Sequence, residues 1–253
     1  MSARLRLSLG RSFLIARREL IAAFDSAIAP VAIIVSLLFV TTAFMNGFFL
    51  AGRVEMASFF ARLPLFLALL VPALTMRLFA EEKKTRTIEL LFSLPLSTGE
   101  AVLGKFLASL GLVVLFLMGT LTIPALLAWL GDPDGGAIVS GYLGLLCLSA
   151  ELCALGLFFS ALARDQIVAF VAAAVTGSAL ILFGDPRVKS ALDGLSDNPH
   201  AAPGTRLAEW LSPAGRLFEF DRGVVSLGSL FFFASFTVFF LWAAGFVLDR
   251  ERE

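Results

Sequence analysis

Long apolar runs separated by short polar segments dominate the hydropathy pattern of the chain. A helix needs about 20 mainly apolar residues to cross a bilayer core that is about 30 Å thick, and six runs reach or approach this length. The pattern therefore predicts an all-α membrane protein with six transmembrane helices. Their predicted ranges are 27–50, 63–80, 101–130, 137–162, 166–184 and 224–248.

Composition supports this class, because 253 residues with 58% hydrophobic content, 26 Phe and 16% charged residues would leave apolar surface wet in a soluble domain. Cys147 and Cys153 lie six residues apart in one apolar run, on different faces of a helix, so we expect no disulfide between them. The only histidine, His200, falls in a predicted loop. We therefore predict no histidine-based catalytic dyad, no multi-histidine metal site and no catalytic residue.

The distribution of Lys and Arg predicts the orientation of the spans, because these residues stay preferentially on the cytoplasmic side. With six spans and a cytoplasmic N-terminus, most of the 20 basic residues lie on the inner side. Both termini are therefore predicted to be cytoplasmic. The predicted outer loop, 185–222, runs against the bias, since it contains Arg187, Lys189, Arg206, Arg216 and Arg222.

Residues 1–25 precede the first span and are predicted to form an amphipathic helix in the headgroup layer, where its arginines meet anionic lipid. The alternative is a solvated charged segment that only fixes the topology. Asp25 and Ser26 are suited to cap the next helix, with Pro30 in its first turn. The apolar positions at helical spacing are Leu5, Leu9, Phe13, Ala16 and Leu20, and the arginines on a different side are Arg4, Arg11 and Arg18.

The densest charge cluster lies in the predicted cytoplasmic loop 81–100. Glu82 and Arg86 stand four residues apart, with the acid first, as in a helix-stabilising pair, and Pro95 would end such a helix. Ile88, Leu90, Leu91, Phe92 and Leu94 form an apolar group that is too concentrated for a water-facing turn. The segment is therefore predicted to be a docking element, the alternative being a solvated loop that anchors topology.

Residues 99–105 read G-x-x-x-x-G-K, the phosphate-loop pattern, but Phe106 occupies the position that needs a Ser or Thr hydroxyl. A proline-containing turn precedes the match and a predicted span follows it, so we interpret the match as chance. Any ATP that powers the protein must then bind another polypeptide.

Glu151 is the single acidic residue well inside a predicted span, which makes it a candidate intramembrane polar site. The alternative is a carboxyl group that is neutral, hydrogen-bonded to a neighbouring helix or facing a wet cavity. Pro64, Pro72 and Pro124 are predicted to bend their spans.

The later part of the loop 185–222 suits short apolar-faced helices broken at Pro213. They would form an outer interface or a partly re-entrant hairpin, and an ordinary surface loop is the alternative. The apolar positions are Leu207, Trp210, Leu211, Leu217, Phe218 and Phe220.

Residues 72–106, PALTMRLFAEEKKTRTIELLFSLPLSTGEAVLGKF, closely resemble the signature of ABC type-2 transporter permeases, in the branch of the gliding-motility and nitrous-oxide-reductase maturation permeases. The resemblance covers nearly the whole chain. It includes RREL and FDSAIAP within 17–30, GDPD at 131–134, GYLGLL at 141–146, GLFFSALARDQIVA at 156–169, LSP at 211–213 and RGV at 222–224. This chain has Ser226 and Ser229 where similar permeases often carry acidic residues after RGV.

The resemblance implies a non-enzymatic six-span subunit of the bacterial inner membrane that dimerises with a second copy or a homologous permease. Each half would be served by a separate cytoplasmic ABC ATPase, which binds ATP and Mg. The N-terminal helix would be the connecting helix and the loop 185–222 an outer gate hairpin. The implied coupling helix comprises Glu81, Glu82, Lys83, Lys84, Thr85, Arg86, Glu89, Leu91 and Phe92, and the implied second cytoplasmic contact comprises Arg164, Asp165 and Gln166.

The leading hypothesis is therefore the permease subunit of an ATP-driven exporter. A companion membrane protein with a large outer domain would point to the gliding-motility-like branch. One alternative is an ATP-independent secondary transporter or channel that uses Glu151, and another is a membrane scaffold for an outer-surface assembly. The bilayer is the expected surrounding in every case, and no nucleic-acid partner is expected.

Overall fold

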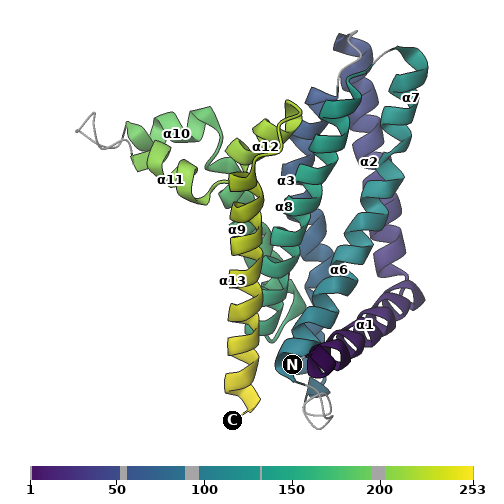
Figure 1. The fold of residues 1–253 in the computed structure, drawn as a ribbon, viewed down its shortest axis with the longest axis vertical. Helices are drawn as coiled ribbons and strands as arrows, with labels where there is room; N and C mark the ends of the chain where they lie inside the picture. The colour runs from purple at the N-terminus through teal and green to yellow at the C-terminus, as the bar shows by residue number, and fades with distance from the viewer. Residues whose placement is uncertain (1, 52–55, 89–96, 132, 195–202, 253) are drawn as a thin grey trace.

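The computed structural model describes residues 2–51, 56–88, 97–131, 133–194 and 203–252, and the regular elements of this part are all helices. The long helices form a bundle, with the N-terminal helix α1 and the C-terminus at the same end (Figure 1). The helices are α1 Ser2–Asp25, α2 Ile28–Ala51, α3 Ala57–Thr75, α4 Arg77–Lys84, α6 Thr98–Thr120, α7 Thr122–Leu130, α8 Gly135–Leu162, α9 Gln166–Leu182, α10 Pro186–Asp193, α11 Pro203–Leu211, α12 Ala214–Asp221 and α13 Leu227–Arg252.

Five helical segments of the described chain are long and apolar enough to cross a membrane, namely 28–47, 57–84, 98–130, 135–162 and 227–252. A sixth span is obtained if α9 and α10 count as one broken segment, which bends by 83°. The predicted all-helical membrane protein is confirmed at this level of five to six spans. The number of spans is five or six because α9 has 17 residues, a length close to that of the shortest helix that spans a bilayer.

Two spans are interrupted close to prolines. The break between α3 and α4 falls at Met76, four residues after Pro72, and the break between α6 and α7 falls at Leu121, three residues before Pro124. Proline has no backbone N–H, so Pro124 leaves the helical hydrogen bond to the Thr120 carbonyl unmade. The chain nevertheless continues across each break as a single candidate span.

Helix α8 lies inside the bundle and packs against α3, α6, α9 and α13. Helices α3 and α8 approach closely at Gly156 because this residue has no side chain: an added Cβ would lie 2.1 Å from the Thr75 hydroxyl oxygen. At Gly144 an added Cβ would lie 2.9 Å from the Phe220 ring. Small residues of α8 therefore allow α3 and α12 to come into direct contact with it.

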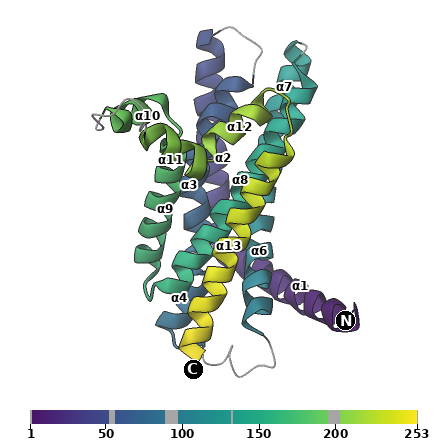
Figure 2. The ribbon, with the colours of Figure 1, turned by 60° about the vertical axis from the view of Figure 1, so that its left-hand side comes forward.

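Helix α1 crosses the end of the bundle at an angle and packs on α6 (Figure 2). Ser12 and Ala16 are buried, whereas Phe13 is 66% exposed and Leu14 is 64% exposed. Of the predicted apolar positions, Ala16 therefore packs inward and Phe13 faces outward, while Ile15 and Leu20 lie against Gly104 and Gly111 of α6.

At the opposite end, α10 and α11 pack on each other and project sideways from the bundle (Figure 1). Helix α12 then returns to α8 and buries Phe220. The predicted pair of short helices broken at Pro213 is confirmed, since α11 ends at Leu211 and α12 begins at Ala214. Gly223 adopts a φ of 82° after α12, a conformation that glycine tolerates best, so the chain can turn there into α13.

Candidate functional site

Charged side chains form ion pairs at the end of the bundle where α1 and the C-terminus lie (Figure 1). Ion pairs between described residues at this end join α1, α4, α6, the turn before α9, and α13. Several of the residues implied as cytoplasmic contacts lie here. We therefore consider this charged end as the candidate functional site.

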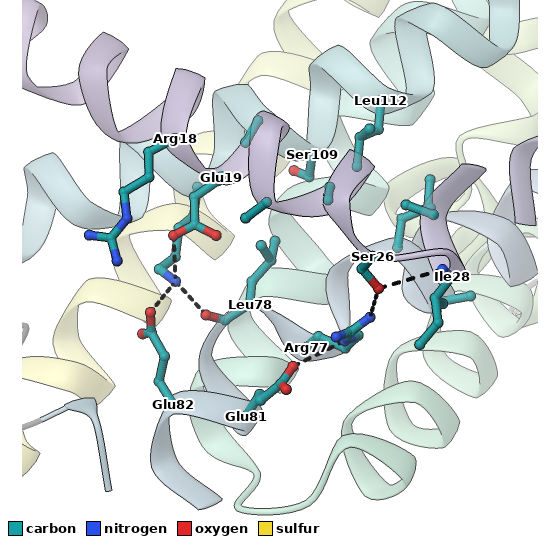
Figure 3. Close-up of a pocket in the computed structure, with 17 residues that line it drawn as sticks. Arg18, Glu19, Ser26, Ile28, Arg77, Leu78, Glu81, Glu82, Ser109 and Leu112 are labelled. Carbon is teal, nitrogen blue, oxygen red and sulfur yellow. Dashed lines mark hydrogen bonds and ion pairs between the residues drawn. The ribbon is translucent and has the colours of Figure 1, made fainter. Parts of the chain in front are cut away.

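Lys105 of α6 is the most buried charge of the site, with 1% of the residue exposed. Its Nζ donates hydrogen bonds of 2.7 Å to Glu82 Oε1 and 2.5 Å to the Leu78 carbonyl oxygen. Glu19 Oε1 of α1 lies 3.4 Å from the same nitrogen, and Figure 3 shows Glu19, Leu78 and Glu82 converging around it. The ammonium group also lies 4.9 Å from the centre of the Phe79 ring. One buried cation thus connects α6 with α1 and α4.

Lys83 and Lys84 connect α4 with the rest of the same end. Lys83 Nζ lies 2.7 Å from Glu251 Oε1 of α13 and also donates to the Ala161 carbonyl oxygen of α8. Lys84 Nζ lies 3.1 Å from Asp165 Oδ2. The pKa of Asp165 is lowered by the hydrogen bond from the Ile167 backbone N–H, and then by Lys84. The carboxylate of Asp165 is therefore held in its charged form as the cap of α9.

Ser160 joins α8 to α4 where α3 is interrupted. Its hydroxyl oxygen accepts hydrogen bonds from the backbone N–H groups of Phe79, at 3.0 Å, and Ala80, at 3.1 Å. The same hydroxyl donates to the Met76 carbonyl oxygen at 3.0 Å. Backbone groups at the start of a helix lack partners within it, so this buried side chain satisfies them.

The implied coupling helix differs from its prediction where it is described. Helix α4 ends at Lys84, and Arg86 has a φ of 59°, which is incompatible with a continuous right-handed helix. The predicted Glu82–Arg86 pair is therefore wrong, because Glu82 turns inward to Lys105 instead. Residues 84–87 are exposed, and 85–87 form a turn. Glu89, Leu91 and Phe92 lie outside the described residues.

Residues 99–105, the phosphate-loop match, are part of helix α6. The Ser97 side chain accepts from the Glu100 backbone N–H, and the Glu100 carboxylate accepts from the Ser97 backbone N–H, which is a complete capping box. The Glu100 N–H is used by this capping box, and from Ala101 onward the backbone N–H groups are used in helical hydrogen bonds. This segment therefore does not form a phosphate-binding cradle.

The two implied cytoplasmic contacts lie next to each other. The described members of the first contact are Glu81 to Lys84 in α4 and Thr85 and Arg86 in the turn after it. In the second contact, Arg164 and Asp165 lie just before α9, and Gln166 is its first residue. The Lys84–Asp165 ion pair joins the two groups, and Arg164 beside it is exposed.

Glu151 does not belong to the charged end. It is 1% exposed in the middle of α8, and its Oε2 has no hydrogen-bond partner in the described part of the chain. Gly144, Glu151 and Phe158 recur every seven residues on one stripe of α8, and the Phe158 ring lies 6.0 Å from that of Phe240 on α13. Glu151 therefore lies on the side of α8 that faces α12 and α13.

The sequence reasoning missed four residues of the charged end. Lys105 is predicted only as part of the phosphate-loop match, and Glu19, Asp249 and Glu251 are not among the predicted site residues. Asp249 Oδ1 accepts a hydrogen bond of 2.5 Å from the Thr98 hydroxyl. The available signal was charge complementarity, since Lys105 stands alone at the start of a long apolar helix and needs a partner if it is buried.

An all-helical bundle of five to six apolar spans with its ion pairs at one end defines a multi-pass membrane protein. Residues 54–201, more than half of the chain, match the family model described as ABC-2 family transporter protein, so the chain belongs to this family. A search of curated proteins finds no match to the chain. Family membership makes the chain a transmembrane permease subunit and implies association with an ABC ATPase partner.

Proposed function

We propose that the chain is the permease subunit of an ATP-driven exporter in the bacterial inner membrane, acting as a dimer with a second copy or a homologous permease. It would couple ATP hydrolysis on a separate cytoplasmic ATPase to movement of its spans, and its relatives would lie in the gliding-motility and nitrous-oxide-reductase maturation branch. The observation that carries the proposal is the linkage of α4, which ends in the exposed turn 85–87, to helices throughout the bundle.

The contacts of α4 suggest how a force on this turn spreads. Lys83 joins α4 to α8 and α13, Lys84 joins it to the start of α9, and Glu82 joins it through Lys105 to α6 and α1. Buried and partly buried ion pairs are costly to separate, because each partner would be left without its counter-charge. A displacement of α4 by a docked ATPase would therefore move these helices together.

ATP and Mg would bind the partner subunit rather than this chain. The phosphate-loop match is helical, and Lys105 is already engaged by two carboxylates. The contribution of the chain is then mechanical, and the residues at the ATPase contact would be Glu81 to Phe92 together with Arg164, Asp165 and Gln166.

The test is charge reversal at the exposed turn in the full-length chain, co-expressed in turn with each ABC ATPase of its host. Arg86→Glu is expected to lower co-purification of the ATPase about tenfold, because a new repulsive charge at an interface costs about 1.4 kcal/mol or more. Arg187→Glu on α10, which is exposed at the opposite end of the bundle, is the matched control. Equal ATPase recovery with both variants would refute the docking site.

The projecting α10–α11 pair suits contact with a companion protein at the outer surface, since Trp210 is 77% exposed there. Aromatic residues such as Trp are enriched both at protein interfaces and at membrane surfaces. Cross-linking from position 210 in intact cells would identify a companion with a large outer domain.

A secondary transporter or channel remains the second candidate function, because Glu151 has an unpartnered buried oxygen inside a candidate span. Ion-driven transport that needs no ATP and is lost on Glu151→Gln would favour it. Transport that stops when the ATPase is inactivated, and survives Glu151→Gln, would exclude it.

A further inference from the structure

A cavity of about 280 Å³ lies between α1, α2, α3–α4 and α6, at the charged end of the bundle. Figure 3 shows Arg18 and Glu19 of α1, Ser26 and Ile28 at the start of α2, and Arg77, Glu81 and Glu82 around it. The deeper wall is apolar and includes Ala73, Ala108 and Leu112. The cavity is slightly smaller than typical small-molecule pockets of about 300–1,000 Å³, so it suits a headgroup better than a whole ligand of drug size.

The charged groups of the cavity are not all satisfied within the described chain. Lys105 is fully engaged by Glu19, Glu82 and the Leu78 carbonyl. Arg18, in contrast, is exposed and makes no ion pair or hydrogen bond among the described residues. Glu82 Oε2 is buried without a hydrogen-bond partner in that same part of the chain. Considering the described residues alone, Arg18 is thus a cation without a partner at the cavity, and Glu82 Oε2 is a carboxylate oxygen without one.

The remaining pair of the cavity can also engage a ligand. Arg77 donates hydrogen bonds of 3.0 Å to Glu81 Oε2 and of 3.1 Å to the Ser26 hydroxyl oxygen, and its side chain is 30% exposed. The Glu81 side chain is 43% exposed and uses only Oε2 in its ion pair with Arg77, so among the described residues its second oxygen is available to a ligand. Basic and acidic side chains lie side by side in the wall, so charge complementarity favours a ligand that carries both a phosphate and an ammonium group.

The surroundings of the cavity favour a lipid over a soluble ligand. Ile28 lines the cavity and is 52% exposed, and Val31 and Val35 further along α2 are 55% and 58% exposed. On the adjoining α1, Ile21 and Phe24 are also about half exposed. An apolar surface that starts at the cavity and continues along a span provides a place for an acyl chain at the membrane interface.

We propose that this cavity binds the headgroup of a phospholipid with a primary ammonium group, a phosphoethanolamine, with its phosphate at Arg18 and Arg77 and its ammonium at Glu81 and Glu82. The ammonium donates hydrogen bonds that a trimethylated choline headgroup lacks. An anionic phosphoglycerol headgroup would meet the same carboxylates without a compensating cation. The bound lipid would hold α1 against α2 and α4, next to the proposed ATPase contact.

The test uses the full-length chain in detergent micelles, without any ATPase, and short-chain lipids with identical tails. Phosphoethanolamine lipid is expected to raise the thermal unfolding midpoint at about tenfold lower concentration than phosphocholine or phosphoglycerol lipid, and native mass spectrometry should show one retained molecule per chain. Arg18→Gln is expected to weaken this effect about tenfold, since one charge-assisted hydrogen bond is lost. The matched control is Arg17→Gln, because Arg17 is exposed beside Arg18 but does not line the cavity.

Glu81→Gln provides an independent variant that keeps the hydrogen bond to Arg77. It should reduce the preference for phosphoethanolamine over phosphocholine lipid and strengthen the response to phosphoglycerol lipid, whose anionic headgroup then meets one carboxylate fewer. Equal responses to the three lipids, a response to inorganic phosphate alone, or equal behaviour of Arg18→Gln and Arg17→Gln would overturn the proposal. None of these outcomes bears on ATPase docking, so the two proposals fail separately.

Discussion

Replacement of Lys105 by Met tests whether the buried ion cluster stabilises the fold. Met keeps most of the apolar stem and removes the charge, so Glu82 and Glu19 lose a shared cation that is 2.7 Å and 3.4 Å away. Loss of one partner of a buried pair costs about 3–5 kcal/mol. The Glu19 and Glu82 side chains are 23% and 25% exposed, but Glu82 Oε2 itself is buried. Water can therefore solvate the Glu19 carboxylate better than that of Glu82, and we expect a loss of about 3–4 kcal/mol.

The assay is reversible unfolding of the purified chain in mixed micelles by a titrated denaturing detergent, followed by the change in helical circular dichroism. Lys84→Met is the matched control, because Lys84 is 61% exposed and pairs with a partly exposed Asp165. Exposed ion pairs contribute about 0–1 kcal/mol, so the control should unfold almost as the unmodified chain does.

A double variant separates the ion pair from general packing. If the cost of Lys105→Met is an uncompensated carboxylate, adding Glu82→Gln should restore part of the lost stability, since a neutral amide replaces the stranded charge. The reasoning is refuted if the free energy of unfolding of the Lys105→Met chain lies within about 1 kcal/mol of that of the unmodified chain, which is the contribution of an exposed ion pair. It is also refuted if the double variant loses more stability than the losses of the two single variants added together.

Three further predictions concern other parts of the bundle. Gly156→Ala should destabilise the chain by about 1–3 kcal/mol, because the added Cβ would lie 2.1 Å from the Thr75 hydroxyl oxygen. Gly245→Ala is the control and should be neutral or slightly stabilising, since no atom lies within 4 Å of its added Cβ. Titration with a denaturing detergent compares the unfolding free energies of the two variants. Ser160→Ala should cost about 1–3 kcal/mol in the same titration, because two buried backbone N–H groups lose their acceptor. Burial raises the pKa of Asp221 from 3.8 to about 6, so the folded chain holds a proton that the unfolded chain has lost, and stability should fall as the pH rises through this window. Asp221→Asn should abolish that fall and stabilise the chain at pH 7 by about 1 kcal/mol, allowing for partial exposure, which unfolding midpoints at several pH values would check.

The spans were predictable from the sequence because the property that defines them is local. A run such as 135–162 is apolar over a length that only a membrane or a large core can accommodate, and α8 covers this range. The capping of α2 was predictable for the same reason, since the Ser26 hydroxyl lies two residues before the Ile28 N–H that donates to it, at 3.5 Å. The division of the second span at Met76 was not predictable to the residue, because Ser160 of a distant helix supplies the bonds that support it.

The sequence indicated a charge cluster in the loop 81–100 but not how its side chains pair. Glu82 and Arg86 match the spacing of a helical pair, and that rule holds only while the helix continues. The chain instead reverses at Arg86, where φ is 59°, and the carboxylate finds Lys105 on another helix. Pairing across helices depends on tertiary packing, which a single sequence does not reveal. Family-level recognition did not need such detail, because the motif at 72–106 is a contiguous pattern.

The structure also gives a reason for some of the basic residues in the predicted outer loop 185–222, which the predicted orientation does not favour. Of the basic residues in the loop 185–222, Arg216 lies over the Phe232 ring at 5.8 Å and Arg222 over the Phe218 ring at 4.2 Å. Such cation–π contacts contribute about 0.5–1 kcal/mol at exposed sites, which is a structural reason for cations at this end. Arg17 and Arg18 on α1, by comparison, are exposed and have no ion pair among the described residues. Cations without a structural partner are the ones whose placement reports orientation, so this contrast supports the proposal that α1 lies on the cytoplasmic side.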